Sequence, residues 1–242
     1  MRIPRFFVAN QLAADSEIDL PKDVAHYISN VLRLTSEAPI VLFNGDGNEY
    51  SATLTNVSKR HAQAYVDAKL SIDVQSNLRI HLGQAVSKGD RMDWVLQKAT
   101  ELGVDAITPV QTQRCAVKLS AERWQKKSEQ WHKVIQSACE QCGRNTLPTL
   151  NAPVSAAEWL KSQTSATRII FDPNEEMRLA NLQLPSSEVR IFVGPEGGLT
   201  EQEVYSAKQI GYLGLSLGPR ILRTETAALA TIAALQAMHG DL

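Results

Sequence analysis

The sequence predicts an α/β protein in which a small β-rich domain precedes a larger domain with a mostly parallel sheet. In the first seventy residues, a turn-forming cluster, Asn44-Gly45-Asp46-Gly47-Asn48, separates two short apolar runs. From residue 78 onward, strand-like runs alternate with helical patterns. Near the C-terminus two glycine-rich segments, 194–198 and 217–226, each follow a strand-like run and precede a helix. Strands that are spaced by helices indicate a parallel sheet covered on both faces.

The composition is that of an ordinary soluble protein. The chain has 242 residues, of which 43% are hydrophobic and 21% charged, enough for one small and one medium domain. The longest apolar stretch, 227–238, is too short to span a bilayer, and the N-terminus shows no signal-peptide pattern. Three cysteines, an odd number, favour a reducing compartment. We therefore expect a cytoplasmic protein with no membrane partner.

The first domain is expected to span residues 1–72 as a small β-barrel or half-barrel. A short helix over 22–31 precedes strands at 40–43 and 50–57, which the glycine-rich cluster joins as a hairpin. A further strand is predicted at 62–66. The polar stretch 70–77 marks the boundary, so the second domain is expected to span 73–242.

In the second domain the strands are predicted at 79–86, 106–110, 168–171, 189–193 and 213–217. Helices are predicted over 91–102, 120–141, 201–210 and 226–238. Asp90 and Ser120 are expected N-caps, and Thr200 with Glu203 has the spacing of a capping box. Gly103, Gly143 and Gly211 are expected to end helices. The last helix is apolar on nearly every side and must be buried all round, which favours a subunit interface.

The two glycine-rich segments together predict a ligand site. Glycine allows a positive φ and close approach of the main chain, and ligands of open α/β sheets bind beyond the carboxyl ends of the strands. Main-chain groups with Ile221 and Leu222 beside them suit a nucleoside better than a triphosphate. The alternative is two tight turns without a ligand. Neither the phosphate-loop pattern nor the Gly-x-Gly-x-x-Gly dinucleotide pattern occurs in the chain.

Other polar groups leave alternatives open. Cys139 and Cys142 could bind zinc or perform redox chemistry. Only Cys115 remains as a further thiol, the histidines are scattered, and the pair falls at the end of a predicted helix, so ordinary buried thiols and no metal are expected. Arg223 and Glu225 adjoin an apolar helix, where burying an unpaired charge costs free energy. Either they form an ion pair with each other that stabilises the turn, or they take part in a reaction.

Charge is uneven along the chain. The net charge is −1, but residues 71–164 carry 12 Lys/Arg against 9 Asp/Glu. A polyanion such as RNA could dock there, and the alternative is a solvated helix surface. The basic residues concerned are Arg114, Lys118, Arg123, Lys126, Lys127, Lys133 and Arg144.

At the level of motifs the sequence resembles the SPOUT-class RNA methyltransferases, and within them the RsmE family of 16S rRNA uridine-N3 methyltransferases. The resemblance rests on Phe192-Val-Gly-Pro-Glu-Gly-Gly-Leu199 and Leu217-Gly-Pro-Arg-Ile-Leu-Arg-Thr-Glu-Thr-Ala227. Lys88-Gly-Asp-Arg-Met-Asp-Trp-Val-Leu-Gln-Lys-Ala-Thr-Glu-Leu-Gly103, Ala138-Cys-Glu-Gln-Cys-Gly-Arg144 and residues 26–33 agree with it. The likeness covers essentially the whole chain.

The resemblance implies a SPOUT-type second domain with a deep trefoil knot, in which knot and cofactor site span about 168–238, and a PUA-like first domain that helps hold RNA. It implies a homodimer that forms through the second domain, with the active site near the subunit interface. It also implies S-adenosylmethionine as cofactor and N3 of a uridine in the decoding region of the assembled 30S subunit as methyl acceptor. A methyltransferase acting on tRNA and a non-catalytic RNA-binding protein are the alternatives.

Carried over residue by residue, the resemblance places the cofactor against both glycine segments and one strand end. The residues are Phe171, Gly194, Glu196, Gly197, Gly198, Leu217, Gly218, Ile221, Leu222, Thr226 and Ala227. Methyl transfer to uracil N3 requires loss of a proton and stabilisation of negative charge on the carbonyl oxygens. We expect Arg223 to stabilise that charge and Glu225 or Glu196 to orient the base or accept the proton. The expected RNA contacts are Arg5, Arg33, Lys88, Arg91, Arg114 and Arg144.

Overall fold

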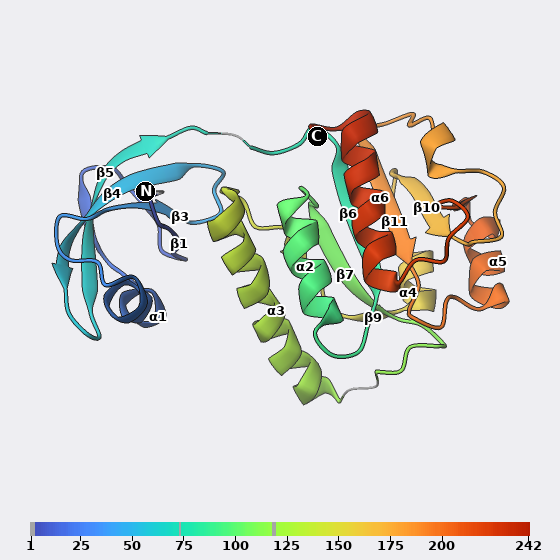
Figure 1. Ribbon diagram of the computed structural model, residues 1–242, viewed down its shortest axis with the longest axis horizontal. Helices are drawn as coiled ribbons and strands as arrows, with labels where there is room; N and C mark the ends of the chain where they lie inside the picture. The colour runs from blue at the N-terminus through green and yellow to red at the C-terminus, as the bar shows by residue number, and fades with distance from the viewer. Residues whose placement is uncertain (1–2, 73, 118–119) are drawn as a thin grey trace. The chain divides into compact units, whose positions relative to one another are not determined.

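The computed structural model describes residues 3–72, 74–117 and 120–242. Residue 73, which begins the predicted second domain, and Lys118 of the basic segment lie outside this range. The chain divides into two compact units, Met1–Gln75 with Cys139–Leu147 and Ser76–Ala138 with Pro148–Leu242. Figure 1 shows strands and helices in the order expected of an α/β protein, so the predicted fold class is confirmed.

A five-stranded sheet in the order β1-β3-β4-β5-β2 forms the first unit. Its strands are β1 (Arg5–Phe7), β2 (Ser16–Asp19), β3 (Pro39–Phe43), β4 (Glu49–Val57) and β5 (Ala62–Leu70). The predicted hairpin is confirmed, because β3 and β4 pair antiparallel across a turn in which Gly45 and Gly47 have positive φ. β1 and β2 were not predicted. They are short, and only pairing with β3 and β5 makes them strands.

The predicted helix of the first unit has two parts. α1 (Lys22–His26) continues into a π-helical segment, Tyr27–Leu32, which ends at Arg33 in the left-handed conformation. Val24, Ala25 and Ile28 are buried in the core of this unit. Because Arg33 leaves the helix in this way, its side chain is not part of a regular helical face.

The second unit is built on a parallel sheet in the order β12-β10-β11-β6-β7-β8, and β9 also pairs with β7. The strands are β6 (Arg79–Ala85), β7 (Ala106–Gln111), β8 (Thr149–Leu150), β9 (Val154–Ser155), β10 (Thr167–Phe171), β11 (Glu188–Val193) and β12 (Leu213–Leu215). Every pairing described in this sheet is parallel. The predicted trefoil knot stays a prediction.

The helices of this part of the chain are α2 (Arg91–Glu101), α3 (Ala121–Cys142), α4 (Ala156–Lys161), α5 (Glu201–Gln209) and α6 (Thr224–His239), with a 3-10 turn at Leu179–Asn181. The capping box of α5 is confirmed, and Gly103 has the expected positive φ after α2. Asp90 is not a side-chain cap, because its backbone is already helical and its carboxylate makes no cap hydrogen bond. The short α4 was not predicted.

Helices lie on both faces of this sheet, with α2 and α6 in front of it and α4 behind it in Figure 1. Successive residues of β6 point to opposite faces of the sheet and so contact different helices. Gln84 bonds to Thr224 at the start of α6, whereas Gly83 faces the ring of Trp159 in α4. A Cβ on Gly83 would lie 2.4 Å from that ring, so only glycine lets α4 pack so closely on the sheet.

None of the helices in the described part of the chain is long and apolar enough to cross a membrane.

His81 lies on the α4 side of β6 in a partly enclosed polar cluster. Its Nε2 is 2.8 Å from Thr108 Oγ1, and its ring meets Trp159 edge to face at 4.9 Å. Burial and, secondarily, the positive charge of Arg190 lower the pKa of His81 to about 4. The folded protein therefore holds this imidazole neutral.

We expect this histidine to make stability depend on pH. Between pH 6.5 and about 4 the unfolded chain binds a proton that the folded protein does not. The contribution of His81 to the free energy of unfolding is therefore complete above pH 6.5 and is lost as the pH falls toward 4. Between pH 7 and 5 the free energy of unfolding should fall by about 1 kcal/mol more in the wild type than in His81→Gln, allowing for solvent screening. Urea unfolding at both pH values measures this, and equal pH dependence in the two proteins would contradict it.

Candidate active site

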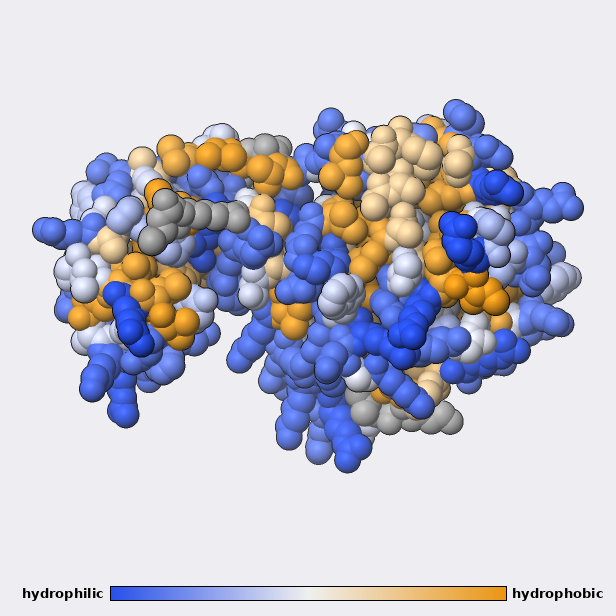
Figure 2. Space-filling model, viewed as in Figure 1, coloured by the Kyte–Doolittle hydropathy of each residue, from blue (hydrophilic) through white to orange (hydrophobic). Residues whose placement is uncertain are grey.

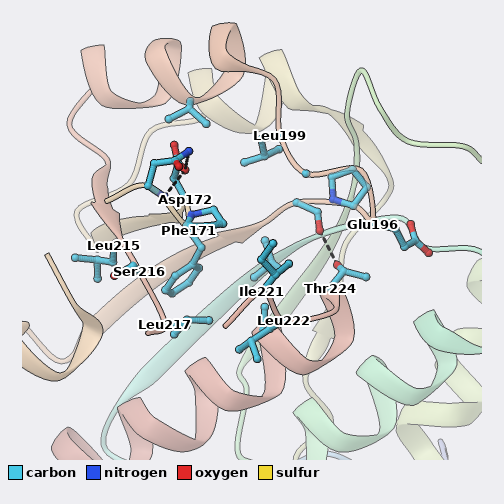
Figure 3. A pocket seen from close by; sticks show the side chains of 18 of the residues that line it. Phe171, Asp172, Glu196, Leu199, Leu215, Ser216, Leu217, Ile221, Leu222 and Thr224 are labelled. Atoms are coloured by element: carbon cyan, nitrogen blue, oxygen red, sulfur yellow. Dashed lines mark hydrogen bonds between the residues drawn. The ribbon is translucent and has the colours of Figure 1, made fainter. Parts of the chain in front are cut away.

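Two loops meet at the carboxyl ends of β10, β11 and β12 and enclose a cavity of about 400 Å³. One loop follows β11 and the other follows β12, as the pairing of the glycine segments predicted. Figure 3 shows the cavity with Phe171 from β10 on one side and Ile221, Leu222 and Thr224 on the other. The wall combines apolar side chains with main-chain groups of both loops, which is the composition of a small-molecule site.

Glycines give these loops their shape. A Cβ on Gly194 would lie 2.9 Å from Leu199 Cγ and 3.1 Å from the Leu199 amide nitrogen, so the first loop can fold back on itself only with glycine there. Gly198 and Gly218 have φ values of +69° and +99°, which side-chain-bearing residues rarely adopt. The backbone conformation of the cavity wall therefore requires these glycines in both motifs.

Thr224 ties the first loop to the helix and the sheet. Its hydroxyl donates to the Gly194 carbonyl at 2.6 Å (Figure 3) and accepts from Gln84 Nε2 at 2.9 Å. Thr224 and Gln84 are both buried. These hydrogen bonds join β6, the loop after β11 and the first turn of α6. Sequence reasoning missed both residues, since neither role has a local signal.

Most of the predicted cofactor residues line this cavity. Those that do are Phe171, Gly194, Glu196, Gly198, Leu217, Gly218, Ile221, Leu222 and Ala227. Gly197 and Thr226 are not in its wall. The Gly197 carbonyl instead accepts from Arg114 Nη1 at 3.0 Å, and Thr226 faces a second cavity. Lining residues that were not predicted include Asp172, Asn174, Leu199 and Ser216.

Ser216 falls in a hydrolase-like pattern, Gly214-Leu-Ser-Leu-Gly218. The side chain is buried, and its hydroxyl is 3.5 Å from the Met177 carbonyl. No histidine is found among the residues that line this cavity. The geometry therefore excludes an exposed nucleophile at Ser216.

A second cavity, of about 810 Å³, is lined by both arginine and glutamate side chains. Its residues are Lys88, Gly89, Asp90, Arg91, Trp94, Arg223, Glu225 and Thr226. Two of the three predicted catalytic residues and two predicted RNA contacts thus come together. The third, Glu196, lines the first cavity and connects the two, because its carboxylate binds Arg91.

Arg91 is the cation that organises these carboxylates. Its Nη1 lies 2.7 Å from Glu196 Oε1 and its Nε 4.0 Å from Glu225 Oε1. Burial alone would raise the pKa of Glu196, but hydrogen bonds from its own amide, from Arg91 and from the Lys88 amide hold it below its ordinary value. Glu196 is therefore ionised and held in place.

The interpretation of Arg223 and Glu225 as a mutual ion pair is wrong. The carboxylate of Glu225 faces Arg91, and Arg223 is exposed as the N-cap residue of α6. The premise that Arg223 is buried also fails, because the chain leaves its guanidinium open to the second cavity.

The six predicted RNA contacts fall into three groups. Lys88, Arg91 and Arg33 are exposed or half-exposed, which suits RNA contact. Arg114 is exposed, but its Nη1 bonds the carbonyls of Gly197 and Leu199 and so supports the first loop.

Arg5 and Arg144 do not fit the prediction, because both are buried among partners of their own unit. Arg5 pairs with Glu49, bonds Asn145 Oδ1 at 2.6 Å and retains only 8% side-chain exposure. Arg144 is 4% exposed and donates to Gln75 Oε1 at 3.1 Å. The distribution of charge along the sequence could not distinguish these structural arginines from surface ones.

The three cysteines are free thiols, and Cys115 and Cys139 are buried. Burial raises the pKa of Cys139 to about 12, so this thiol is unreactive near neutral pH. Within residues 3–72, 74–117 and 120–242 there is no group of three or more His, Cys, Asp and Glu side chains that could hold a metal ion.

Comparison with protein families gives two matches along the chain. Residues 74–236 match an RNA methyltransferase domain, and residues 20–66 match an RNA methyltransferase PUA domain. The first match covers most of the second unit and both glycine loops.

Relatives of known name cover the whole chain. The ribosomal RNA small subunit methyltransferase E of Buchnera aphidicola subsp. Schizaphis graminum is 35% identical over 100% of this chain and 98% of that protein. The Bacillus subtilis protein of the same name is 31% identical over 98% and 99% of the two chains.

Solved structures agree in fold and length. The ribosomal RNA small subunit methyltransferase E of Neisseria gonorrhoeae, bound to S-adenosyl methionine, is 41% identical with a TM-score of 0.93, and the match covers 100% of both chains. A Legionella pneumophila methyltransferase in complex with the same cofactor is 38% identical with a TM-score of 0.97, again over 100% of both. The chain therefore belongs to the RNA methyltransferase family named ribosomal RNA small subunit methyltransferase E, with a PUA-like first domain and a SPOUT-type second domain.

Proposed function

We propose that this protein transfers the methyl group of S-adenosylmethionine to N3 of a uridine in the decoding region of 16S rRNA, on the assembled small subunit. The observation that carries the proposal is the pair of adjoining cavities. One is walled by glycine loops and apolar side chains, and the other is lined by Arg223, Glu225 and exposed cations. Cofactor and RNA base would thus be held side by side, with the reacting atoms brought into line.

The first cavity suits S-adenosylmethionine. Its volume of about 400 Å³ lies in the range of small-molecule sites. Phe171, Leu217, Ile221 and Leu222 would contact the apolar faces of the nucleoside, while main-chain groups near Gly194 and Gly218 would bond its polar edges. When bound, the cofactor supplies an activated sulfonium methyl group, so the transfer needs no metal ion.

The second cavity would receive the uridine, flipped out of its stack. Uracil N3 is a poor nucleophile until its proton leaves, and the resulting negative charge spreads onto the carbonyl oxygens. Arg223 would stabilise that charge. Glu225 or Glu196 would orient the base or accept its proton through water. Lys88 and Arg91 would neutralise nearby phosphates, a contact that positions RNA without reading its sequence.

The α6 helix supports the predicted homodimer. Its buried residues are Thr224, Ala228, Thr231, Ile232, Leu235 and Gln236, so the chain alone does not bury the helix all round. Figure 2 shows apolar side chains gathered over α6 on the visible face. We propose that a second copy covers this face in a cytoplasmic homodimer.

Substrate mapping tests the reaction. The protein and labelled S-adenosylmethionine are incubated with 30S particles, naked 16S rRNA and tRNA, and the modified nucleoside is identified. We expect 3-methyluridine at one site of 16S rRNA, formed best on 30S particles. Label in tRNA alone would favour a tRNA methyltransferase, and no label with no cofactor binding would favour a non-catalytic RNA-binding protein.

Gly218→Ala should weaken cofactor binding about tenfold. Alanine at φ +99° carries a strain of about 1–2 kcal/mol. Relieving this strain moves the loop that forms the cavity wall. If the same free energy is lost from cofactor binding, the Kd rises about tenfold. Gly211→Ala is a matched control, since Gly211 has φ +89° and equally open surroundings but lies outside the cavity. Calorimetry with S-adenosylmethionine measures both variants, and equal affinities would contradict the assignment.

Arg223→Ala should lower kcat on small-subunit particles by about 10²–10³-fold, because it removes a donor to the developing negative charge. The Kd for S-adenosylmethionine should stay near the wild-type value, since Arg223 lines the second cavity and not the first. Arg223→Lys keeps the charge and should retain more activity. Near-normal methyl transfer by Arg223→Ala would show that its proposed role is wrong.

A further inference from the structure

Two carboxylates adjoin the proposed methyl-transfer site, and their surroundings differ. Glu196 Oε1 accepts from Arg91 Nη1 at 2.7 Å and from the Lys88 amide at 3.4 Å. A carboxylate bound to a guanidinium group in this way is stabilised in its charged form, which makes it a weak proton acceptor. Consistent with this, the pKa of Glu196 lies below its ordinary value.

Glu225 has a spare acceptor. It lies in the first turn of α6 with 17% of its side chain exposed. Its Oε1 is 4.0 Å from Arg91 Nε, beyond hydrogen-bond distance. Its Oε2 is buried and has no hydrogen-bond partner among the residues that the structure describes. An acceptor left unpaired in a buried position costs about 1–3 kcal/mol, a cost that an incoming N–H donor would remove.

The second cavity offers no equivalent acceptor. Lys88, Arg91 and Arg223 are cations, and Thr226 carries only a hydroxyl. Asp90 lines the cavity, but it is exposed to solvent, so its carboxylate is not a buried, unpaired acceptor like Glu225 Oε2. Glu225 thus combines burial, an unpaired oxygen and a position two residues from Arg223.

We propose that Glu225 is the general base that removes the N3 proton, and that Arg91 is a positioning residue that holds Glu196 as a fixed anion beside the cofactor. The inference rests on the proposed function. The N–H electron pair stays on N3 as the proton passes to the Glu225 carboxylate, directly or through one water. N3 then bonds to the methyl carbon as the C–S bond breaks toward sulfur, which yields 3-methyluridine and S-adenosylhomocysteine. The carboxylic acid of Glu225 afterwards returns its proton to solvent.

The experiment compares Glu225→Gln with Glu196→Gln on two substrates. One is 30S particles carrying ordinary 16S rRNA, and the other is particles reconstituted with 16S rRNA that contains 5-fluorouridine, whose N3 proton is more acidic. Glu101→Gln is the control, because Glu101 pairs with Lys98 on α2 outside both cavities. The Kd for S-adenosylmethionine is measured for every variant, and circular dichroism verifies that each variant is folded.

On ordinary particles Glu225→Gln should lose about 10²–10⁴-fold in kcat, the usual contribution of a general base, with the Kd for the cofactor retained. On 5-fluorouridine particles the ratio of wild-type kcat to Glu225→Gln kcat should be about tenfold smaller than on ordinary particles, because removal of a more acidic proton depends less on the base. Glu196→Gln should mainly weaken cofactor binding and show no such recovery. Glu225→Asp, which keeps a carboxylate, should retain partial activity and offers a second test where the Gln variant does not fold.

The outcomes distinguish a wrong assignment of the general base from a wrong proposed function. Normal kcat in Glu225→Gln, or loss with fluorouridine recovery in Glu196→Gln, would overturn the assignment of the base while the wild type still forms 3-methyluridine. A wild type that forms no 3-methyluridine on either particle would overturn the proposed function and this inference together.

Discussion

The buried hydrogen bonds of Thr224 are the interaction on which the candidate site depends. One hydroxyl donates to the Gly194 carbonyl and accepts from Gln84, so the first loop, the central strand β6 and the start of α6 are fixed together. The first turn of α6 also carries Ala227, which lines the first cavity, and Glu225, which lines the second. The hydrogen bonds of Thr224 therefore fix the position of one cavity relative to the other. The two cavities adjoin at the first turn of α6, and the proposed group transfer would need cofactor and acceptor held in line there.

Parallel topology supplies the rest of the arrangement. The strands β10, β11 and β12 run in the same direction, so their carboxyl ends, and the loops that follow them, open on one edge of the sheet. Close packing behind the sheet depends on Gly83, which admits the ring of Trp159. The loops can therefore be irregular and glycine-rich, since the strands and helices that hold them are tightly packed.

Much of the fold could be predicted from local patterns. The hairpin between β3 and β4, the parallel strands β6, β7, β10 and β11, and the capping box of α5 all have short-range signals, and all are present. β1, β2 and α4 were missed because they are short and depend on partners distant in the sequence. Asp90 failed as a cap because its own backbone is already helical and its carboxylate makes no cap hydrogen bond.

The sequence by itself determined the α/β class and the two glycine loops that form part of the wall of the first cavity, because a turn that needs glycine after a strand is a local requirement. Only the tertiary structure decided what each charged side chain does. Arg5 and Arg144 became buried structural residues, and Arg91, not Arg223, came to face Glu225. The partners of these charges lie many residues away, and burial and ion pairing are set by packing across that separation, which no local pattern encodes.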